Sequence, residues 1–349
     1  MLTYFTAFFI SILLTYLMTP MVKRMAFRID ALDMPGERRI NTRAIPTMGG
    51  IAIYLGFLFP VLLLTNMSST VLGIVLGASF ILIVGILDDL YELSPGVKLA
   101  GQIAAASILI FFGVKVEFIT NPFGGMIYLG SWGIPLTLLW VVSITNTVNL
   151  VDGLDGLAAG ISSIAAFILF FVALQEGQFV AAIMAVTLAG SSLGFLKFNF
   201  NPAEIFMGDT GAMFLGFVLA AISVSGALKS AAAVTLVVPV LALGVPIFDT
   251  IFAIVRRVYN GKPIGEADQG HLHHRLLALG LNQRQAVLSV YAISFGLGLM
   301  ALIINGANLQ DAVILLFSVV ILLVYGAWKV GIFSVELPAE GTSFENSNL

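Results

Sequence analysis

The sequence contains no cysteine and few charged residues. Of its 349 residues, 10% are charged and 59% are hydrophobic, and the mean hydropathy is +1.04. Because a soluble domain usually carries about 25% charged residues, this composition excludes a soluble globular protein and indicates a polytopic membrane protein. The absence of cysteine also excludes disulfide bridges, a thiol nucleophile and a zinc site built on thiolates.

Apolar segments of membrane-spanning length recur along the chain. A spanning helix needs about 20 residues, with about 17 as the lower limit. We expect an all-α polytopic membrane protein in which residues 1–335 form one multi-span membrane domain and residues 336–349 a disordered tail. The sequence predicts eleven transmembrane helices, at residues 2–22, 49–65, 70–87, 98–114, 132–150, 157–174, 178–196, 210–228, 230–255, 285–304 and 310–328.

Lysine and arginine are distributed unequally between the two sets of loops. If the N-terminus is outside, 14 of the 16 basic residues fall in inner loops, and only Lys115 and Lys229 fall outside. An excess of basic residues marks the cytoplasmic side, so we expect an external N-terminus and a cytoplasmic C-terminus. Residues 115–131 alternate apolar and polar side chains around two turn sequences, which favours either a short outer β-hairpin or an ordinary connector.

Aspartates gather at the inner ends of the predicted spans. Asp88 and Asp89 follow one span directly, and Asp209 precedes another. Charged groups at this depth are costly to desolvate, so they are expected to face a wet cavity, a cation or a partner. Adjacent helical residues point about 100° apart, so both aspartates of the pair face one partner only if the helix ends there. The alternatives are solvated interfacial acids and, for Asp209, a helix N-cap.

The stretch NTVNLVDGLDG, at residues 146–156, places polar residues at intervals of three. Asn146, Asn149, Asp152 and Asp155 form a stripe on one face if the stretch is helical. The carboxylates would then come from adjacent turns. This arrangement predicts the centre of a polar site.

Basic residues and all three histidines also lie in the inner loops. Arg43, with its neighbours in the first inner loop, is interpreted as a contact either for lipid headgroups or for a substrate phosphate, and Lys98 begins the span after the aspartate pair. The cytoplasmic loop 256–284 contains the sequence HLHHR, which we expect to contact a phosphate or sugar or to cap a surface helix. Its members are His271, His273, His274 and Arg275.

This combination of groups favours phosphate chemistry at the membrane. Clustered carboxylates with amide neighbours suit Mg²⁺, with Mn²⁺ as a substitute, and the basic residues bind what the metal does not neutralise. No GxxxxGK motif and no GxGxxG motif in a strand-turn-helix context is present, which excludes P-loop and Rossmann enzymes. The alternatives are a cation-coupled transporter, which predicts acids near mid-span and repeated halves, and a non-catalytic scaffold.

Four sequence stretches together resemble one family. GILDDLYELSPGVKL, TNTVNLVDGLDGL, NPAEIFMGDTGAMFLG and GHLHHRLL are similar, in this order, to the polyprenyl-phosphate N-acetylhexosamine-1-phosphate transferases, in particular their WecA and TagO branch. The resemblance implies transfer of a sugar 1-phosphate from a UDP-sugar to polyprenyl phosphate at the inner membrane face, with magnesium and with release of UMP. It also implies a bacterial cytoplasmic membrane protein, plausible as a homodimer, with no nucleic-acid partner.

The resemblance also assigns roles to individual residues. Asp88 and Asp89 match the family's aspartate pair, which activates the acceptor phosphate and binds metal, and Asp209 matches the magnesium ligand. The catalytic and nucleotide cleft is expected to include Asn149, Asp152, Asp155 and Lys98, with His271, His273, His274, Arg275 and Arg43 binding substrate.

The same comparison indicates one branch of the family and shows one position at which this sequence differs from the family pattern. HLHHR resembles the branch that uses UDP-N-acetylglucosamine and undecaprenyl phosphate, and the peptidoglycan branch, with a plain run of histidines, is the runner-up. Asn41 stands where relatives often have histidine, which puts a catalytic role for that position in doubt.

Overall fold

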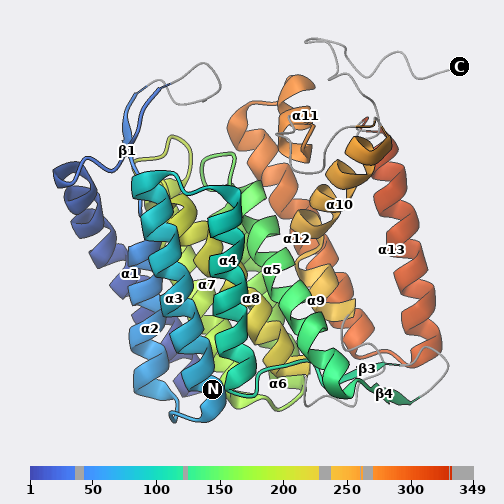
Figure 1. Cartoon of the computed structure of the whole chain (residues 1–349). Coiled ribbons are helices and arrows are strands. Elements are labelled where there is room, and N and C mark those ends of the chain that lie inside the picture. The colour runs from blue at the N-terminus through green and yellow to red at the C-terminus, as the bar shows by residue number, and fades with distance from the viewer. Residues whose placement is uncertain are drawn as a thin grey trace, which may run out of the picture.

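A computed structural model describes residues 1–35, 43–120, 125–227, 237–259, 261, 270–329 and 331. Its helices lie side by side in one bundle (Figure 1). The predictions that concern Asn41 and the tail 336–349 fall outside these residues.

Eight helices in the described part of the chain are long and apolar enough to cross a membrane, which agrees with a helical polytopic membrane protein. Two shorter apolar helices, α2 and α4, stand beside them (Figure 1). The predicted orientation in the membrane stays a prediction. The ten helices are α1 (Leu2–Arg28), α2 (Gly50–Leu64), α3 (Ser69–Tyr91), α4 (Pro95–Phe111), α5 (Gly133–Val151), α6 (Leu157–Gln175), α7 (Phe179–Asn199), α8 (Gly208–Ala227), α12 (Gln283–Asn305) and α13 (Leu309–Lys329).

The predicted span at 230–255 is divided where the structure describes it. α9 (Val237–Ala242) and α10 (Gly244–Tyr259) are separated at Leu243. Pro246 has no amide hydrogen, so the helical hydrogen bond back to the carbonyl of Ala242 cannot form. The prediction of one uninterrupted helix here is therefore wrong, and the total of eleven spans stays a prediction because residues 228–236 lie outside the described part. α10 leans toward the end of α13 (Figure 1).

α8 is the most buried of the eight long helices, and glycines bring its neighbours into backbone contact with it. A Cβ atom added to Gly85 of α3 would lie 2.5 Å from the Cα atom of Thr210. One added to Gly50 of α2 would lie 2.2 Å from the amide nitrogen of Gly211. Small residues allow this close packing of membrane helices. The first turn of α8 is consequently fixed against both α2 and α3.

Short elements lie at both ends of the bundle (Figure 1). We call the end of the bundle where α3 finishes and α8 begins the site end. This end carries α11 (Leu272–Ala278) and a pair of strands, β1 (Leu32–Asp33) and β2 (Ile45–Pro46). At the opposite end β3 (Phe118–Thr120) pairs antiparallel with β4 (Met126–Tyr128), ahead of the short helix η1 (Gly130–Trp132). These strands fall within the range for which the sequence favours a hairpin.

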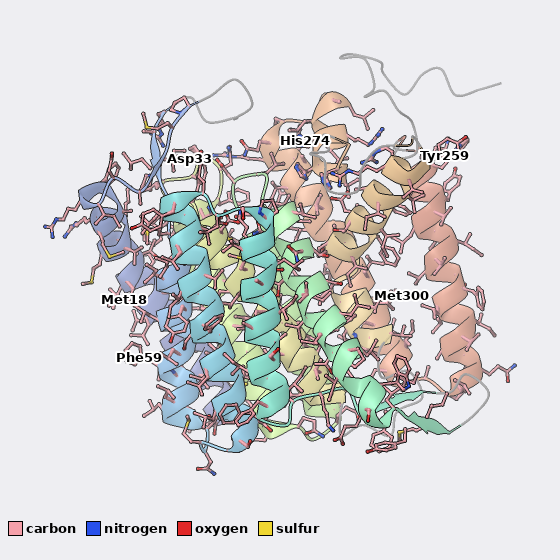
Figure 2. The ribbon with its side chains drawn as sticks, in the orientation of Figure 1. Met18, Asp33, Phe59, Tyr259, His274 and Met300 are labelled. Atoms are coloured by element: carbon pink, nitrogen blue, oxygen red, sulfur yellow. The ribbon has the colours of Figure 1, made fainter. Side chains whose placement is uncertain are left out.

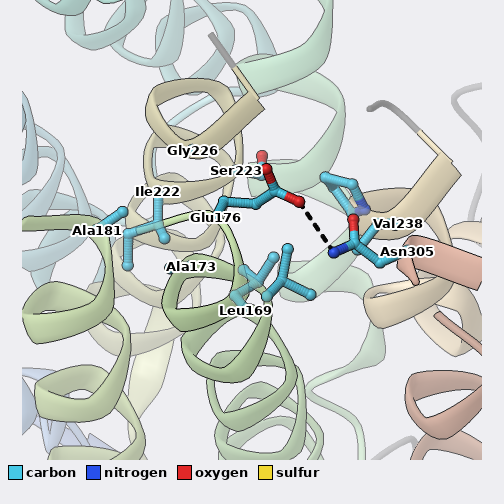
Figure 3. A pocket seen from close by; sticks show the side chains of 11 residues that line it. Leu169, Ala173, Glu176, Ala181, Ile222, Ser223, Gly226, Val238 and Asn305 are labelled. Carbon is cyan, nitrogen blue, oxygen red and sulfur yellow. Dashed lines mark hydrogen bonds between the residues drawn. The ribbon is translucent and has the colours of Figure 1, made fainter. Parts of the chain in front are cut away.

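A small cavity of about 30 Å³ lies at the opposite end, between α6, α8 and α9 (Figure 3). Its walls are mostly apolar. At its edge the side-chain amide of Asn305 donates to the carboxylate of Glu176 over 3.1 Å. A space of this size holds no more than a few water molecules, so it offers no room for a substrate.

Candidate active site

Asp88 lies near the end of α3 and is paired with Lys98 at the start of α4. Its side chain is only 1% exposed; one oxygen accepts from the backbone N–H of Leu93 (2.8 Å), and the other forms an ion pair with Lys98 Nζ. The same Nζ lies 3.6 Å from Asp209 Oδ2. Lys98 therefore stands between two carboxylates that come from α3 and α8.

Asp89 faces a different partner because α3 continues as a helix to Tyr91. Its oxygens accept from the backbone N–H groups of Asp209 (2.8 Å) and Thr210 (3.2 Å) and from the hydroxyl of Thr210 (2.6 Å). The first N–H groups of a helix have no partner within it, and their partial positive charge favours a carboxylate. Asp89 thus caps α8 from a neighbouring helix. Its role as a metal ligand stays a prediction.

The carboxylate of Asp209 is held from two sides and remains open on a third. Asn149, near the end of α5, donates from Nδ2 to Asp209 Oδ1 over 2.5 Å, while Lys98 lies on the Oδ2 side. The Asp209 side chain is 30% exposed. Asp209 is therefore both oriented and accessible, as a residue that meets a ligand must be.

The polar stripe predicted for residues 146–156 is helical only in its first half. Asn146 lies inside the bundle, where it exchanges two hydrogen bonds with Gln102 of α4 (2.6 and 3.1 Å). α5 ends at Val151, and Asp152 and Asp155 lie in the turn before α6. The condition for adjacent helical turns is therefore not met by these two carboxylates. The turn that carries them includes Gly156 at φ +80°, a conformation that favours glycine.

Asp155 is used to hold a neighbouring loop. Its Oδ2 atom accepts from the side-chain amide of Asn201 (3.0 Å) and from the backbone N–H of Ala203 (2.9 Å). Arg43 donates to the carbonyl of Ala203 (3.3 Å), so the first loop is tied to the same place. These contacts put Asp155 and Arg43 at the rim of the site, and their predicted roles in catalysis and substrate binding stay predictions.

Asp152 is surrounded by other carboxylates. Burial, followed by repulsion from Asp209, Asp89 and Asp155, raises the pKa of Asp152 to about 8. With Asp88 these residues form what we call the acid cluster. Three separate parts of the chain supply its negative groups: the end of α3, the turn after α5 and the start of α8.

The histidine-containing segment is fixed by side chains that the motif itself does not include. His271 precedes α11, and its Nδ1 atom lies 2.9 Å from Asp249 Oδ2. Asp249 Oδ1 accepts from the backbone N–H of Leu272 (2.8 Å). Arg275 is 1% exposed and donates to the carbonyls of Gly270 and Gly331. These contacts hold the loop in place, and substrate binding by Arg275 stays a prediction.

His273 brings this segment to the acid cluster. A Cβ atom added to Gly153 would lie 2.6 Å from His273 Nε2, so the ring rests directly on the turn that carries Asp152. The rings of His273 and His274 have their centroids 4.3 Å apart, and Figure 2 shows His274 at the site end of the bundle. Burial, followed by the neighbouring His274, lowers the pKa of His273 to about 3, so its ring is neutral near pH 7.

The donor set of the acid cluster fits a magnesium ion that shares its ligands with a substrate. Among the described residues no three histidine or carboxylate side chains form a preformed metal cage. Mg²⁺ commonly binds one or two carboxylates together with phosphates and water. The partly exposed carboxylate of Asp209 offers an oxygen of this kind, and after burial it is the main cause that raises the pKa of the neighbouring Asp152.

Asp249 lies outside the sequence motifs, and Gly153 lies inside one of them without an expected role. Asp249 is an acid within an otherwise apolar run, where a charge is costly unless it has a partner, and this feature alone is enough to find it. Gly153 matters because His273, 120 positions away in the sequence, packs on it. Nothing local in the sequence indicates that contact.

The central part of the chain matches a known family. Residues 71–227 match the model described as Glycosyl transferase family 4. The match includes the whole acid cluster, together with Lys98 and Asn149.

Proteins similar over most of their length are named as sugar-phosphate transferases. The chain is 42% identical over 317 residues to a Bacillus subtilis protein named probable undecaprenyl-phosphate N-acetylglucosaminyl 1-phosphate transferase, covering 90% of this chain and 88% of that one. It is 38% identical over 310 residues to the decaprenyl-phosphate N-acetylglucosaminephosphotransferase of Mycobacterium leprae, covering 80% and 78%. A phospho-N-acetylmuramoyl-pentapeptide-transferase of Bacillus anthracis is 30% identical over 317 residues, covering 86% and 95%.

The pKa of Asp152 predicts how stability depends on pH. Because folding raises this pKa from 3.8 to about 8, the unfolded state loses this proton at a lower pH than the native state does. Stability therefore falls progressively as pH rises from about 4, and the loss is complete above about pH 8. The amide of Asp152→Asn does not titrate. In magnesium-free detergent solution the thermal midpoint of the wild type should therefore fall more steeply between about pH 5 and about pH 9 than that of Asp152→Asn. Asp311→Asn, at an exposed position, is the control, and parallel curves for Asp152→Asn and the wild type would contradict the assignment.

Proposed function

Since this chain belongs to the family of polyprenyl-phosphate N-acetylhexosamine-1-phosphate transferases, we propose that it transfers N-acetylglucosamine 1-phosphate from UDP-N-acetylglucosamine to undecaprenyl phosphate. UMP is the second product. The reaction takes place at the cytoplasmic face of a bacterial membrane and produces the lipid-linked sugar that starts a cell-envelope glycan. A homodimer is part of the proposal.

One observation carries this proposal: charged groups from distant parts of the chain meet at one end of a membrane-spanning bundle. Asp88, Lys98, Asn149 and Asp209 are connected by contacts of 3.6 Å or less, and His273 approaches from the far end of the sequence. A transporter needs charged groups near mid-span. In this bundle the acid cluster lies at helix ends, where a water-soluble nucleotide and the phosphate of a membrane lipid can meet.

The proposed reaction is a single displacement at phosphorus. An oxygen of the lipid phosphate forms a bond to the β-phosphorus of the UDP-sugar. The bond from that phosphorus to the oxygen bridging the α- and β-phosphates breaks, and UMP leaves with the bridging oxygen. Catalysis of such a step consists mainly of positioning the reactants and compensating their charge.

Lys98 and Asp88 are proposed to act on the lipid phosphate. Lys98 is 30% exposed whereas Asp88 is 1% exposed, so an incoming phosphate meets the ammonium group first. Asp88 forms an ion pair with that ammonium group on its buried side. Asp88 also orients the acceptor phosphate or accepts the remaining proton of that phosphate. Asn149 fixes the neighbouring Asp209 carboxylate.

Asp209, with Asp152 and Asp89 beside it, is proposed to hold magnesium. When bound, the ion supplies positive charge to the pyrophosphate of the donor. Asp209 contributes an accessible oxygen, whereas Asp89 also keeps the first turn of α8 in place. His273 and His274 are proposed to contact the sugar nucleotide, with His273 in its neutral form.

The identity of the donor is tested by a direct assay. Purified protein with undecaprenyl phosphate and magnesium should transfer label from UDP-N-acetylglucosamine to lipid, and removal of the metal with EDTA should stop the transfer until magnesium is restored. UDP-N-acetylgalactosamine and UDP-N-acetylmuramoyl-pentapeptide are the comparison donors. Preference for the pentapeptide donor would assign the chain to the peptidoglycan branch, and no transfer from any donor would reject the proposed function.

Two substitutions test the acid cluster. Asp88→Asn leaves the Lys98 ammonium without its buried carboxylate, and Asp209→Asn removes a charge needed for the metal. Each should lower kcat/KM at least about a hundredfold, the low end for loss of a general base or an electrostatic stabiliser. Asp311→Asn is the matched control at an exposed position of α13. Near-normal turnover by a folded Asp88→Asn or Asp209→Asn variant would rule out the role given to that residue.

The absence of cysteine makes the orientation directly measurable. Gly96→Cys places a thiol at the site end, where a Cβ atom meets nothing within 4 Å. Asn66→Cys places one at an exposed position of the opposite end. A membrane-impermeant maleimide added to intact cells should label Asn66→Cys and leave Gly96→Cys unmodified until the cells are opened. Labelling of Gly96→Cys from outside would reverse the proposed orientation.

A further inference from the structure

We propose that Asp249 is a positioning residue for the reaction: it fixes the ring of His271 and the start of α11, and thereby holds His273 against the acid cluster. Asp249 lies on α10, a helix from outside the acid cluster. The inference rests on the proposed function, because it concerns how the sugar nucleotide is bound in that same site.

The carboxylate of Asp249 joins two groups of the histidine-containing segment. One oxygen lies 2.9 Å from His271 Nδ1, and the other accepts from the backbone N–H of Leu272 over 2.8 Å. The Asp249 and His271 side chains are 5% and 7% exposed. A carboxylate accepts hydrogen bonds, so the hydrogen of this contact lies on His271 Nδ1.

α11 needs such an anchor. It has only seven residues, and the side chain of its N-cap residue, His271, makes no capping hydrogen bond. Isolated helices shorter than about 12 residues are marginal in water. The bond from Leu272 to Asp249 therefore supplies a partner for an N–H group that the helix itself cannot satisfy.

The position of His271 is transmitted to the acid cluster through one neighbouring ring. The rings of His271 and His273 are nearly parallel, with an interplanar angle of 6° and centroids 5.9 Å apart. His273 Nε2 in turn rests on Gly153, next to Asp152. A rotation of His271 or a shift of α11 would separate His273 from this turn.

The opposite side of Asp249 is apolar. A cavity of about 210 Å³ lies between α10, α11, α12 and α13. Among the described residues that line it, Asp249 is the only charged one, beside Phe248, Phe252 and Ile293. The Asp249 and His271 side chains are almost fully buried beside these apolar walls, and a hydrogen bond is electrostatically stronger in such surroundings than in water. The pair formed by Asp249 and His271 is thus shielded from competing solvent, as a positioning contact requires.

Asp249→Asn separates positioning from simple support of the fold. Its oxygen can still accept from Leu272, but its amide donates toward Nδ1 and therefore opposes the tautomer that the carboxylate selects. The KM for UDP-N-acetylglucosamine should rise about tenfold, as expected for loss of a buried charge-assisted hydrogen bond. The KM for undecaprenyl phosphate and kcat should change by less than about threefold. Asp311→Asn serves as the control.

A double-mutant cycle identifies the partner of Asp249. His271→Ala removes the imidazole ring and with it the contact to Asp249, so each single variant breaks the same pair. If the two residues act as a unit, the effects of Asp249→Asn and His271→Ala on the KM for the donor should be strongly non-additive. Additive effects, an unchanged KM in a folded Asp249→Asn variant, or a fall in kcat with both KM values unchanged would overturn the inference.

Nitrogen NMR provides a readout that does not depend on activity. The chain has three histidines, so protein labelled with ¹⁵N-histidine gives few imidazole signals, and His271→Asn identifies those of His271. The wild type should show His271 with its hydrogen on Nδ1, and Asp249→Asn should lose that pattern. The same pattern in both proteins would overturn the inference. A wild type that shows the expected tautomer but transfers no sugar phosphate would instead reject the proposed function.

Discussion

The site depends on the hydrogen bonds that Asp89 accepts from the first turn of α8. α8 is the most buried of the long helices, and its first N–H groups need partners that its own turns cannot provide. Asp89 supplies them from α3. As a result the two helices cannot slide past one another without breaking these bonds, and Asp209 is kept beside Lys98 and Asp88. A contact that looks purely architectural thus sets the spacing of the charged groups.

The second constraint is the cost of placing charges at the end of a membrane bundle. Each charged group in the site has a defined neighbour: Lys98 stands between Asp88 and Asp209, and Asn149 donates to Asp209. Asp152 is the exception, since burial and the surrounding negative charges push its pKa to about 8. Near pH 7 a proton on Asp152 therefore relieves the surrounding negative charge, which is how a buried carboxyl without a cationic partner avoids an uncompensated charge.

The sequence predicts the type of fold and most members of the site, because both depend on local patterns. Long apolar runs indicate the helices, and acids at their ends are expensive enough to indicate a site. What the sequence does not reveal is which helix faces which. Asp88 and Asp89 are adjacent, yet one faces Lys98 and the other the start of α8, and only the packing of α3 against its neighbours decides this.

At two places the structure differs from what hydropathy predicts, because a glycine or a proline interrupts the helix there. Asp152 and Asp155 lie in a turn rather than on α5, since Gly156 adopts a positive φ. The apolar composition of residues 230–255 favours one long helix, but the helix is interrupted at Leu243, ahead of Pro246. That break separates α10 from α9, and it is α10 that carries Asp249 to the histidines.

The charged members of the acid cluster are all aspartates, and the close backbone contacts at Gly50 and Gly85 explain how such short side chains can meet. A glutamate has one more rotatable bond, whose freedom is lost when the group is held in place. With aspartate, the position of each carboxylate follows the main chain almost directly. The spacing of these carboxylates is therefore a property of how the helices pack together, and a longer acid would not keep the same spacing.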